Sequence, residues 1–298
     1  MQPSPTLKSS LLEDQVAVVT GAGQGIGRAV AHTLAANGAR VCLADVDASA
    51  VEAEAANIGV FATSFVGDLV EPGVPDLLIK HAIDAFGRLD IIVNAAGYYW
   101  NSVVEKMTDE QFQSMLDIHV VAPFRICRAA APYMCEPAKT EAATGIERFR
   151  KIVNVSAIAA TFGSFGGTNY ATAKGALNGF TKSLALEWGR FKINVNAVAF
   201  GAIQTRFGAP LTAAQTVKTG GREIALGFNE KTSQRHGIAQ QYDPAKVYEP
   251  RPISSNLVGR TGTVQEAADA IFWLSSPLAN YVTGQIVTVS GGERGGLC

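Results

Sequence analysis

The chain has 298 residues, 47% of them hydrophobic and 17% charged, with a net charge of −1. This composition is typical of a globular protein, and the near-neutral charge gives no basis for binding nucleic acid or an anionic membrane. No apolar run approaches the roughly 18–20 residues that span a bilayer, and we expect a cytoplasmic protein.

The first 14 residues are polar, contain Pro and Ser, and lack the apolar core of a signal peptide. They predict a flexible N-terminal arm, and residues 15–298 predict a single domain because no composition break marks a second one. Without metal-ligand spacing, the cysteines predict free, mostly buried thiols and no metal site. They are Cys42, Cys127, Cys135 and Cys298.

A strand, a glycine turn, a helix and a second strand open the predicted domain. Val16–Thr20 is a β-branched apolar run that leads into Gly21–Gly27, and an Ala-rich helix is predicted over Gly25–Asn37. The next apolar run, Arg40–Ala44, ends at Asp45. In such a βαβ unit the glycines let the backbone approach a pyrophosphate, and the helix N-terminus supplies free N–H groups. The pattern predicts dinucleotide binding.

Asp45 also discriminates between cofactors. A carboxylate at the end of the second strand binds the adenosine ribose hydroxyls and repels the extra phosphate of NADP. A site for that phosphate would have Arg or Lys here, whereas the chain reads Asp45-Val46-Asp47 and the nearby Arg28 lies inside the helix. The sequence therefore favours NAD(H).

The middle of the chain continues the alternation of strands and helices. Val60–Val66 and Leu89–Val93 are predicted strands, with a predicted helix at Leu77–Phe86 between them. After the second strand come Asn94–Gly97, small residues that allow a flat ligand to lie against the backbone, and then Tyr98–Trp100. These aromatic residues predict either a lining for an apolar substrate pocket or packing at an interface.

One long helix is predicted over Thr108–Met134, with Thr108 as its N-cap and a bend at Pro123. The charged, Gly- and Ala-containing run Glu136–Arg150 predicts a surface connection to the buried strand Ile152–Val155.

Tyr170 and Lys174 lie four residues apart at the start of a helical pattern that runs to Trp188. Residues with this spacing share one face of a helix. A lysine ammonium near a phenol lowers its pKa, and such a tyrosine can act as general acid or base on an alcohol or a carbonyl. Alone, the spacing also occurs by chance on helices. The predicted βαβ unit supports a catalytic role for this pair, because it would bind a cofactor beside the tyrosine.

The C-terminal part holds a strand at Ile193–Ala199, a helix at Thr263–Leu274 and a last strand at Ile286–Val289. Between the first two, residues 206–256 are polar and aperiodic, which predicts a substrate loop or lid. Strands that alternate with helices throughout predict a parallel sheet covered by helices on both faces, an α/β Rossmann-like doubly wound domain.

These motifs, in this order and over nearly the whole chain, resemble the classical short-chain dehydrogenase/reductase family, and within it the 3-oxoacyl-ACP reductase-like members. The resemblance rests on the glycine turn, on Asn94–Gly97, on the Tyr170/Lys174 pair and on the run Asn194–Ala199. It implies a seven-stranded sheet, a bound NAD(P) and a homo-oligomer, a tetramer or a dimer, built on the long helices.

The resemblance also assigns roles. Tyr170 becomes the catalytic acid/base, and Lys174 holds the nicotinamide ribose. The residues expected at the cofactor are Gly21, Gln24, Gly25, Ile26, Gly27, Asp45, Asp68, Leu69, Asn94, Ala95, Gly97, Tyr170, Lys174, Gly201, Ile203 and Thr205. The residues expected at the substrate are Tyr98, Trp100 and Ala157.

Two positions depart from the family pattern. Where the family places a catalytic serine ahead of the tyrosine, this chain has Ala157, preceded by Ser156. Neighbours in an extended segment point to opposite faces, so Ser156 serves as a catalytic residue only if the register slips. The alternative hydroxyls in the same loop are Thr161, Ser164 and Thr168.

The second departure is His119, at the position of the family's relay asparagine. A histidine can relay protons itself, with an unperturbed pKa near 6.5, or it can merely fill the space. We count it among the candidate catalytic residues.

Three functions compete at this point. The first is an NAD-dependent oxidoreductase that transfers hydride between nicotinamide and a secondary alcohol or ketone on a bulky, mostly apolar substrate, as in secondary metabolism. The second is a non-redox enzyme on the same fold, for dehydration, cyclisation or epimerisation, suggested by Ala157 and His119. The third is a non-catalytic scaffold, which would need neither Tyr170 nor Lys174.

Overall fold

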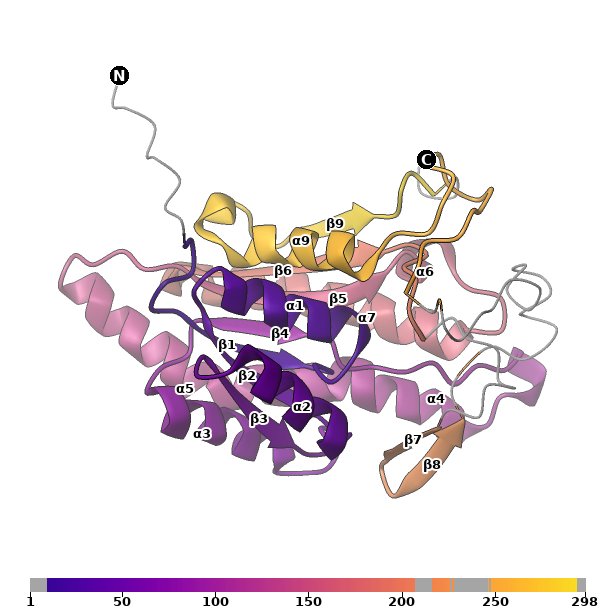
Figure 1. The fold of residues 1–298 in the computed structure, drawn as a ribbon, viewed down its shortest axis with the longest axis horizontal. Helices are drawn as coiled ribbons and strands as arrows, with labels where there is room; N and C mark the ends of the chain where they lie inside the picture. The colour runs from indigo at the N-terminus through magenta and orange to yellow at the C-terminus, as the bar shows by residue number, and fades with distance from the viewer. Residues whose placement is uncertain (1–9, 207–215, 226, 228–245, 247, 294–298) are drawn as a thin grey trace.

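A seven-stranded parallel sheet forms the centre of the protein in the computed structural model, which describes residues 10–206, 216–225, 227, 246 and 248–293 (Figure 1). Its strand order is β3-β2-β1-β4-β5-β6-β9, and every neighbouring pair is parallel. The strands are β1 (Val16–Thr20), β2 (Arg40–Asp45), β3 (Ala62–Val66), β4 (Ile91–Asn94), β5 (Arg150–Ala157), β6 (Ile193–Phe200) and β9 (Ile286–Val289). The predicted α/β fold class is confirmed.

Helices cover both faces of this sheet, each over its own apolar core. Residues of α1, α2 and α9 pack on one face, and residues of α3, α5 and α7 on the other (Figure 1). The helices are α1 (Gly25–Ala36), α2 (Ala48–Ile58), α3 (Val74–Phe86), α4 (Asp109–Leu116), α5 (Ala122–Ala143), α6 (Ala159–Phe162), α7 (Thr168–Trp188) and α9 (Val264–Ser275). Short turns of helix lie at Val104–Lys106, Gly189–Phe191 and Pro277–Ala279.

The topology fixes where a ligand can bind. The chain passes from β1 outward to β2 and β3, then returns to β4 on the other side of β1. In open parallel sheets the crevice at such a switch point, beyond the carboxyl ends of the strands, is where ligands bind. The loops after β1, β4 and β5 therefore surround one site.

The predicted long helix over 108–134 is wrong as a single element. A π-helical segment, Asp117–Val121, separates α4 from α5. Pro123 lies just after this segment, in the first turn of α5, where its missing N–H needs no helical acceptor. The sequence predicted a bend at Pro123, and the helix is instead irregular at the π segment just before it. Helix α5 also continues to Ala143, into the predicted surface connection.

Three other expectations need correction. Helix α2 was not predicted, although Asp47 caps it by accepting from the Ala50 amide. Strand β3 begins at Ala62, because Gly59 has a positive φ and Val60 lies in an exposed turn. The predicted N-terminal arm is docked from residue 10 onward, since Leu12 is fully buried; residues 1–9 lie outside the described residues.

The predicted lid at 206–256 is described only in part. Within it, β7 (Thr216–Thr219) and β8 (Arg222–Ala225) form an antiparallel hairpin. Ile224 is buried with Tyr98 and Met115, so the hairpin packs beside α4. Most of the remaining lid lies outside the described residues.

Two further findings concern the described residues. Cys42, Cys127 and Cys135 are free and buried, as predicted, while Cys298 lies outside the described part. None of the helices that the structure describes combines the length and apolar content needed to cross a bilayer.

Candidate active site

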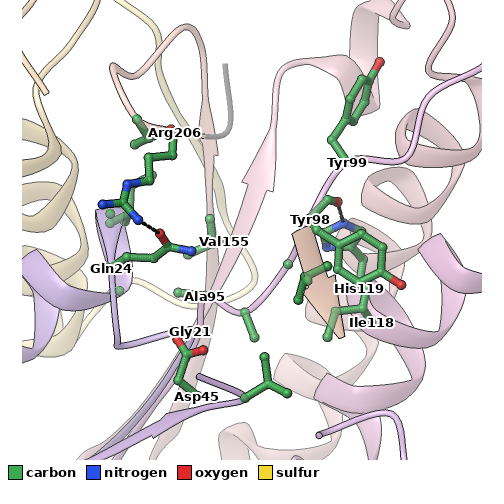
Figure 2. A pocket seen from close by; sticks show the side chains of 18 of the residues that line it. Gly21, Gln24, Asp45, Ala95, Tyr98, Tyr99, Ile118, His119, Val155 and Arg206 are labelled. Carbon is green, nitrogen blue, oxygen red and sulfur yellow. Dashed lines mark hydrogen bonds between the residues drawn. The ribbon is translucent and has the colours of Figure 1, made fainter. Parts of the chain in front are cut away.

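A cavity of about 550 Å³ occupies the switch point of the sheet. It is bounded on one side by the glycine turn and Asp45 and on the other by Tyr98, Ile118 and His119 (Figure 2). Of the residues predicted for the site, nearly all line it. Those that do so are Gly21, Gln24, Gly25, Ile26, Gly27, Asp45, Asp68, Leu69, Ala95, Gly97, Tyr98, His119, Ser156, Ala157, Tyr170, Lys174, Gly201, Ile203 and Thr205.

At two glycines of the turn, Gly21 and Gly27, there is no room for a side chain. Gly21 and Gly25 have positive φ, and a Cβ built at Gly21 would lie 2.8 Å from the Cα of Ala96. A Cβ at Gly27 would overlap the carbonyl oxygen of Gly21. Helix α1 begins here with no side-chain cap and no acidic residue in its first turn, so its free N–H groups are available to an anion. This cradle fits the pyrophosphate of a dinucleotide.

Asp45 is held at the end of β2 by backbone amides. Its Oδ2 accepts from the Gly23 amide at 2.9 Å and its Oδ1 from the Asp47 amide at 3.1 Å. Burial raises the pKa of this carboxyl, and the backbone hydrogen bonds oppose that rise. The carboxylate lies at the cavity edge, where ribose hydroxyls could donate to it.

Asp68 also reaches the cavity, but the lid hairpin engages its carboxylate. Thr219 Oγ1 donates to Oδ1 at 2.9 Å, and the Gly220 amide donates to Oδ2 at 2.6 Å. Strand β7 thereby becomes part of the cavity wall. Asp68 has a second task that the sequence did not show: it anchors the lid.

Two predicted residues do not line the cavity, which corrects their assignment. The Asn94 amide donates to Asn154 Oδ1 at 2.8 Å and so joins β4 to β5. Trp100 contributes its carbonyl oxygen, which accepts from Asn169 at 3.0 Å. In both cases a neighbouring residue faces the ligand space instead, Ala95 in the first and Tyr99 in the second.

Tyr170 and Lys174 lie on one face of α7, as their spacing predicts. Lys174 is buried, and its Nζ donates to the Val155 carbonyl oxygen at 2.6 Å and lies 5.6 Å from the centroid of the Tyr170 ring. Burial lowers the pKa of Lys174 to about 7. Burial raises the pKa of Tyr170, and the nearby Tyr99 adds to the rise. The predicted lowering of the tyrosine pKa is therefore wrong, because desolvation dominates.

Ser156 and Ala157 are the last two residues of β5, the strand before this helix, and pair with Ala199 and Phe200 of β6. Both line the cavity, and neighbours in a strand alternate between the faces of the sheet. Ser156 Oγ donates to Asn178 Oδ1 of α7 at 2.8 Å. Its proton is thus donated to α7, and Ala157, at the position that the resemblance gives to the family's serine, brings no hydroxyl to the cavity.

His119 belongs to the π segment and is fully buried. Its Nε2 lies 2.9 Å from the carbonyl oxygen of Tyr98, drawn as a dashed line in Figure 2. A carbonyl only accepts, so Nε2 carries the proton. Nδ1 has no partner among the described residues. Burial, then the charge of Lys174, holds the pKa of His119 well below 6.5. The ring is therefore neutral, with a free acceptor at Nδ1.

Tyr99 is a site residue that the sequence did not single out from its aromatic neighbours. It is buried, and its ring packs edge-on against Tyr170 with centroids 5.0 Å apart. Its hydroxyl lies 3.1 Å from Ser164 Oγ, one of the alternative hydroxyls in the loop before α7. The contact joins segments far apart in the chain, and no local pattern indicates it.

Comparisons with known proteins agree with this architecture. Residues 15–216 match the family model for short chain dehydrogenases. The chain is 31% identical over 291 residues to the short-chain reductase protein NovJ of Streptomyces niveus, with 97% of each chain covered. It is also 31% identical over 280 residues to the 3-oxoacyl-[acyl-carrier-protein] reductase FabG of Escherichia coli (strain K12), covering 94% of this chain and 97% of that one.

A solved structure gives the same result. The chain superposes on a 3-ketoacyl-(acyl-carrier-protein) reductase from Brucella melitensis, crystallised in complex with NADH, with a TM-score of 0.74 and 26% identity. The match covers 94% of this chain and 98% of that one.

Proposed function

The chain belongs to the short-chain dehydrogenase family of oxidoreductases, which bind a nicotinamide cofactor, and from that premise we propose that it is an NAD(H)-dependent enzyme acting on a secondary alcohol or ketone. The observation that carries the proposal is the position of Tyr170 and Lys174 in the same cavity as the glycine cradle. NAD is favoured over NADP because Asp45, with two backbone amides on its carboxylate, stands where the extra phosphate would lie.

When bound in this cavity, NAD(H) would supply the hydride acceptor for an alcohol carbon or the hydride donor for a ketone carbon. In the reduction Tyr170 donates its phenolic proton to the ketone oxygen and is left as a phenolate. In the oxidation that phenolate accepts the hydroxyl proton of the alcohol as the C=O bond forms. With its raised pKa, Tyr170 holds the proton that a ketone oxygen requires. Lys174, whose Nζ donates to the Val155 carbonyl oxygen, is placed to hold the nicotinamide ribose.

The substrate is proposed to be bulky and mostly apolar, of the kind that secondary metabolism produces. Tyr98 and Tyr99 supply aromatic surface to the cavity, and strand β7 adds Val217. Ala157 supplies no hydroxyl there. One donor to a developing oxyanion is worth roughly 2.7–4 kcal/mol, so its absence slows the reaction without abolishing it.

The test measures absorbance at 340 nm with purified protein, NADH or NADPH, and a panel of ketones. We expect NADH to be consumed in proportion to ketone reduced, and the Tyr170→Phe variant to lose roughly 10²–10⁴ in kcat/KM. NADH binding should survive in that variant. Tyr281→Phe, which alters a fully exposed phenol, is the matched control. Full activity in Tyr170→Phe would refute the acid/base assignment.

A second candidate function is a non-redox reaction on the same site, such as dehydration, cyclisation or epimerisation. It is favoured by Nδ1 of His119, which has no hydrogen-bond partner within the part of the chain that the structure describes, together with Ala157. The His119 ring centroid lies 5.2 Å from that of Tyr170. A neutral imidazole beside a phenol is an acid/base pair that needs no hydride. Product formation with no net change in NADH would establish this function and exclude the first.

We also propose that the working form is a cytoplasmic homo-oligomer. Phe124 and Tyr133 on α5 and Leu186 on α7 are large side chains with 45%, 38% and 86% exposure, on helices that carry subunit contacts in the resembled family. Light scattering on the purified protein should give a mass at least twice 31.3 kDa. The Phe124→Asp variant should shift it toward the monomer.

A further inference from the structure

Arg206 lines the cavity beside the glycine turn and directly follows Thr205. Its Nη1 donates to the side-chain oxygen of Gln24 at 3.4 Å, a long hydrogen bond to a neutral amide. Gln24 is the N-cap residue of α1. Figure 2 shows the guanidinium beside Gln24, on the same side of the cavity as Gly21 and Asp45.

This position is electrostatically unfavourable for a cation with no anion beside it. The N-terminus of α1 carries partial positive charge, and its first turn contains no acidic residue to balance it. Arg28 on the same helix is paired with Glu54 at 3.6 Å, whereas none of the ion pairs among the described residues includes Arg206.

Asp47 is an acidic residue close enough to Arg206 for the two charges to interact. The charge of Arg206 contributes to the lowered pKa of Asp47, after the hydrogen bonds from Ala50 and Ser49. Those hydrogen bonds hold Oδ1 of Asp47 as the cap of α2, and Asp47 forms no ion pair with Arg206 among the described residues. Arg206 and the end of α1 thus form two positive groups that face the same space.

We propose that Arg206 is a cofactor-binding residue: its guanidinium binds the pyrophosphate of the dinucleotide beside the α1 N-terminus. The inference rests on the proposed function, because it assumes that a dinucleotide occupies the cavity. A planar guanidinium matches phosphate oxygens in geometry and charge. Binding would exchange the long contact with Gln24 for a charge-assisted one, so that the phosphates contact two positive groups, the guanidinium and the end of α1.

The adenosine 2′-phosphate of NADP is the competing ligand for this guanidinium. Asp45 and Asp47 stand at the β2 end of the cavity, where that phosphate would lie, and both would repel it. The direct contact of Arg206 is with Gln24 at the helix end instead. The geometry therefore favours the pyrophosphate, which NAD and NADP share.

The test is equilibrium binding to Arg206→Gln, followed by the fluorescence of NADH and NADPH and by competition with ADP and adenosine. We expect roughly tenfold weaker binding of NADH, NADPH and ADP alike, because one exposed charge-assisted contact is lost. Adenosine, which has no phosphate, should bind as it does to the wild type. Melting curves should show that the variant is folded.

Arg28→Gln is the matched control. It removes a guanidinium from α1, and that guanidinium is already paired with Glu54. It should leave the affinity for NADH unchanged. A loss confined to NADPH would assign Arg206 to the 2′-phosphate and overturn the proposal, as would unchanged NADH affinity in Arg206→Gln or an equal loss in Arg28→Gln. A wild-type protein that binds no dinucleotide would refute the proposed function itself.

Discussion

The two sides of the cavity are built in different ways. On the cofactor side the backbone makes the site: Gly21 and Gly27 touch other backbone atoms where side chains would be, and amides hold Asp45. On the reaction side, side chains from separate elements make the site, among them Tyr170 from α7 and His119 from the π segment. A backbone site is fixed with the fold, whereas a side-chain site can change one residue at a time. The departures from the family pattern fall on the second side.

Restoring the missing hydroxyl should have the largest effect. Ala157→Ser places an oxygen on the cavity side of β5, and an added oxyanion donor is worth roughly 10²–10³ in kcat. We expect ketone reduction to rise by up to that factor, measured at 340 nm. Ala159→Ser, on the short helix α6 outside the cavity lining, is the control and should change nothing. Loss of activity in Ala157→Ser would mean that the cavity is shaped around the alanine methyl group.

The cofactor side should tolerate no such addition. In Gly27→Ala the new Cβ overlaps the Gly21 carbonyl oxygen, and overpacking of this kind costs about 1–3 kcal/mol. Gly179→Ala on α7 is the control, because its Cβ meets no atom within 4 Å and alanine favours a helix by about 1 kcal/mol over glycine. Urea unfolding should show opposite signs for the two variants, and NADH binding should weaken only in Gly27→Ala. Equal stabilisation would refute the tight cradle.

The same difference explains what could be predicted from the sequence. Strand, turn, helix and acid follow one another within a short span. The local pattern was therefore enough to predict the cofactor side of the cavity and the parallel sheet. The contacts of the reaction side are long-range: Ser156 meets Asn178, and Tyr99 meets Ser164. Periodicity gives no information about such partners. The docking of the hairpin on Asp68 was missed for the same reason.

Predictions from chemistry alone also failed where burial decided the outcome. A lysine close to a tyrosine was expected to lower the tyrosine pKa, but desolvation of both groups has the larger effect. The length of the helix around His119 was misjudged because the π segment has no sequence signature of its own.

His119 should make the reaction side sensitive to acid. Its pKa in the folded protein lies below the unfolded value of 6.5, so below pH 6.5 the unfolded chain binds a proton that the native protein does not. Stability is then lost as pH falls, by up to about 1.4 kcal/mol per pH unit for one such group. Urea unfolding at pH 7, 6 and 5 should show a smaller loss in His119→Asn. Parallel pH dependence in both proteins would contradict a buried neutral imidazole.

Ser156→Ala should have the smallest effect, and it separates the two neighbours at the end of β5. The variant loses one hydrogen bond to Asn178, which costs about 0.5–1.5 kcal/mol in the free energy of unfolding. Turnover should not change, because the hydroxyl proton already points to α7. A double-mutant cycle with Asn178→Ala would isolate the pair, since both single variants remove the same contact. If Ser156→Ala instead lowered kcat by about 10², the size expected for a lost oxyanion donor, the hydroxyl would have to leave Asn178 during the reaction. In that case the serine at 156, one position from its place in the family pattern, would still be the catalytic one.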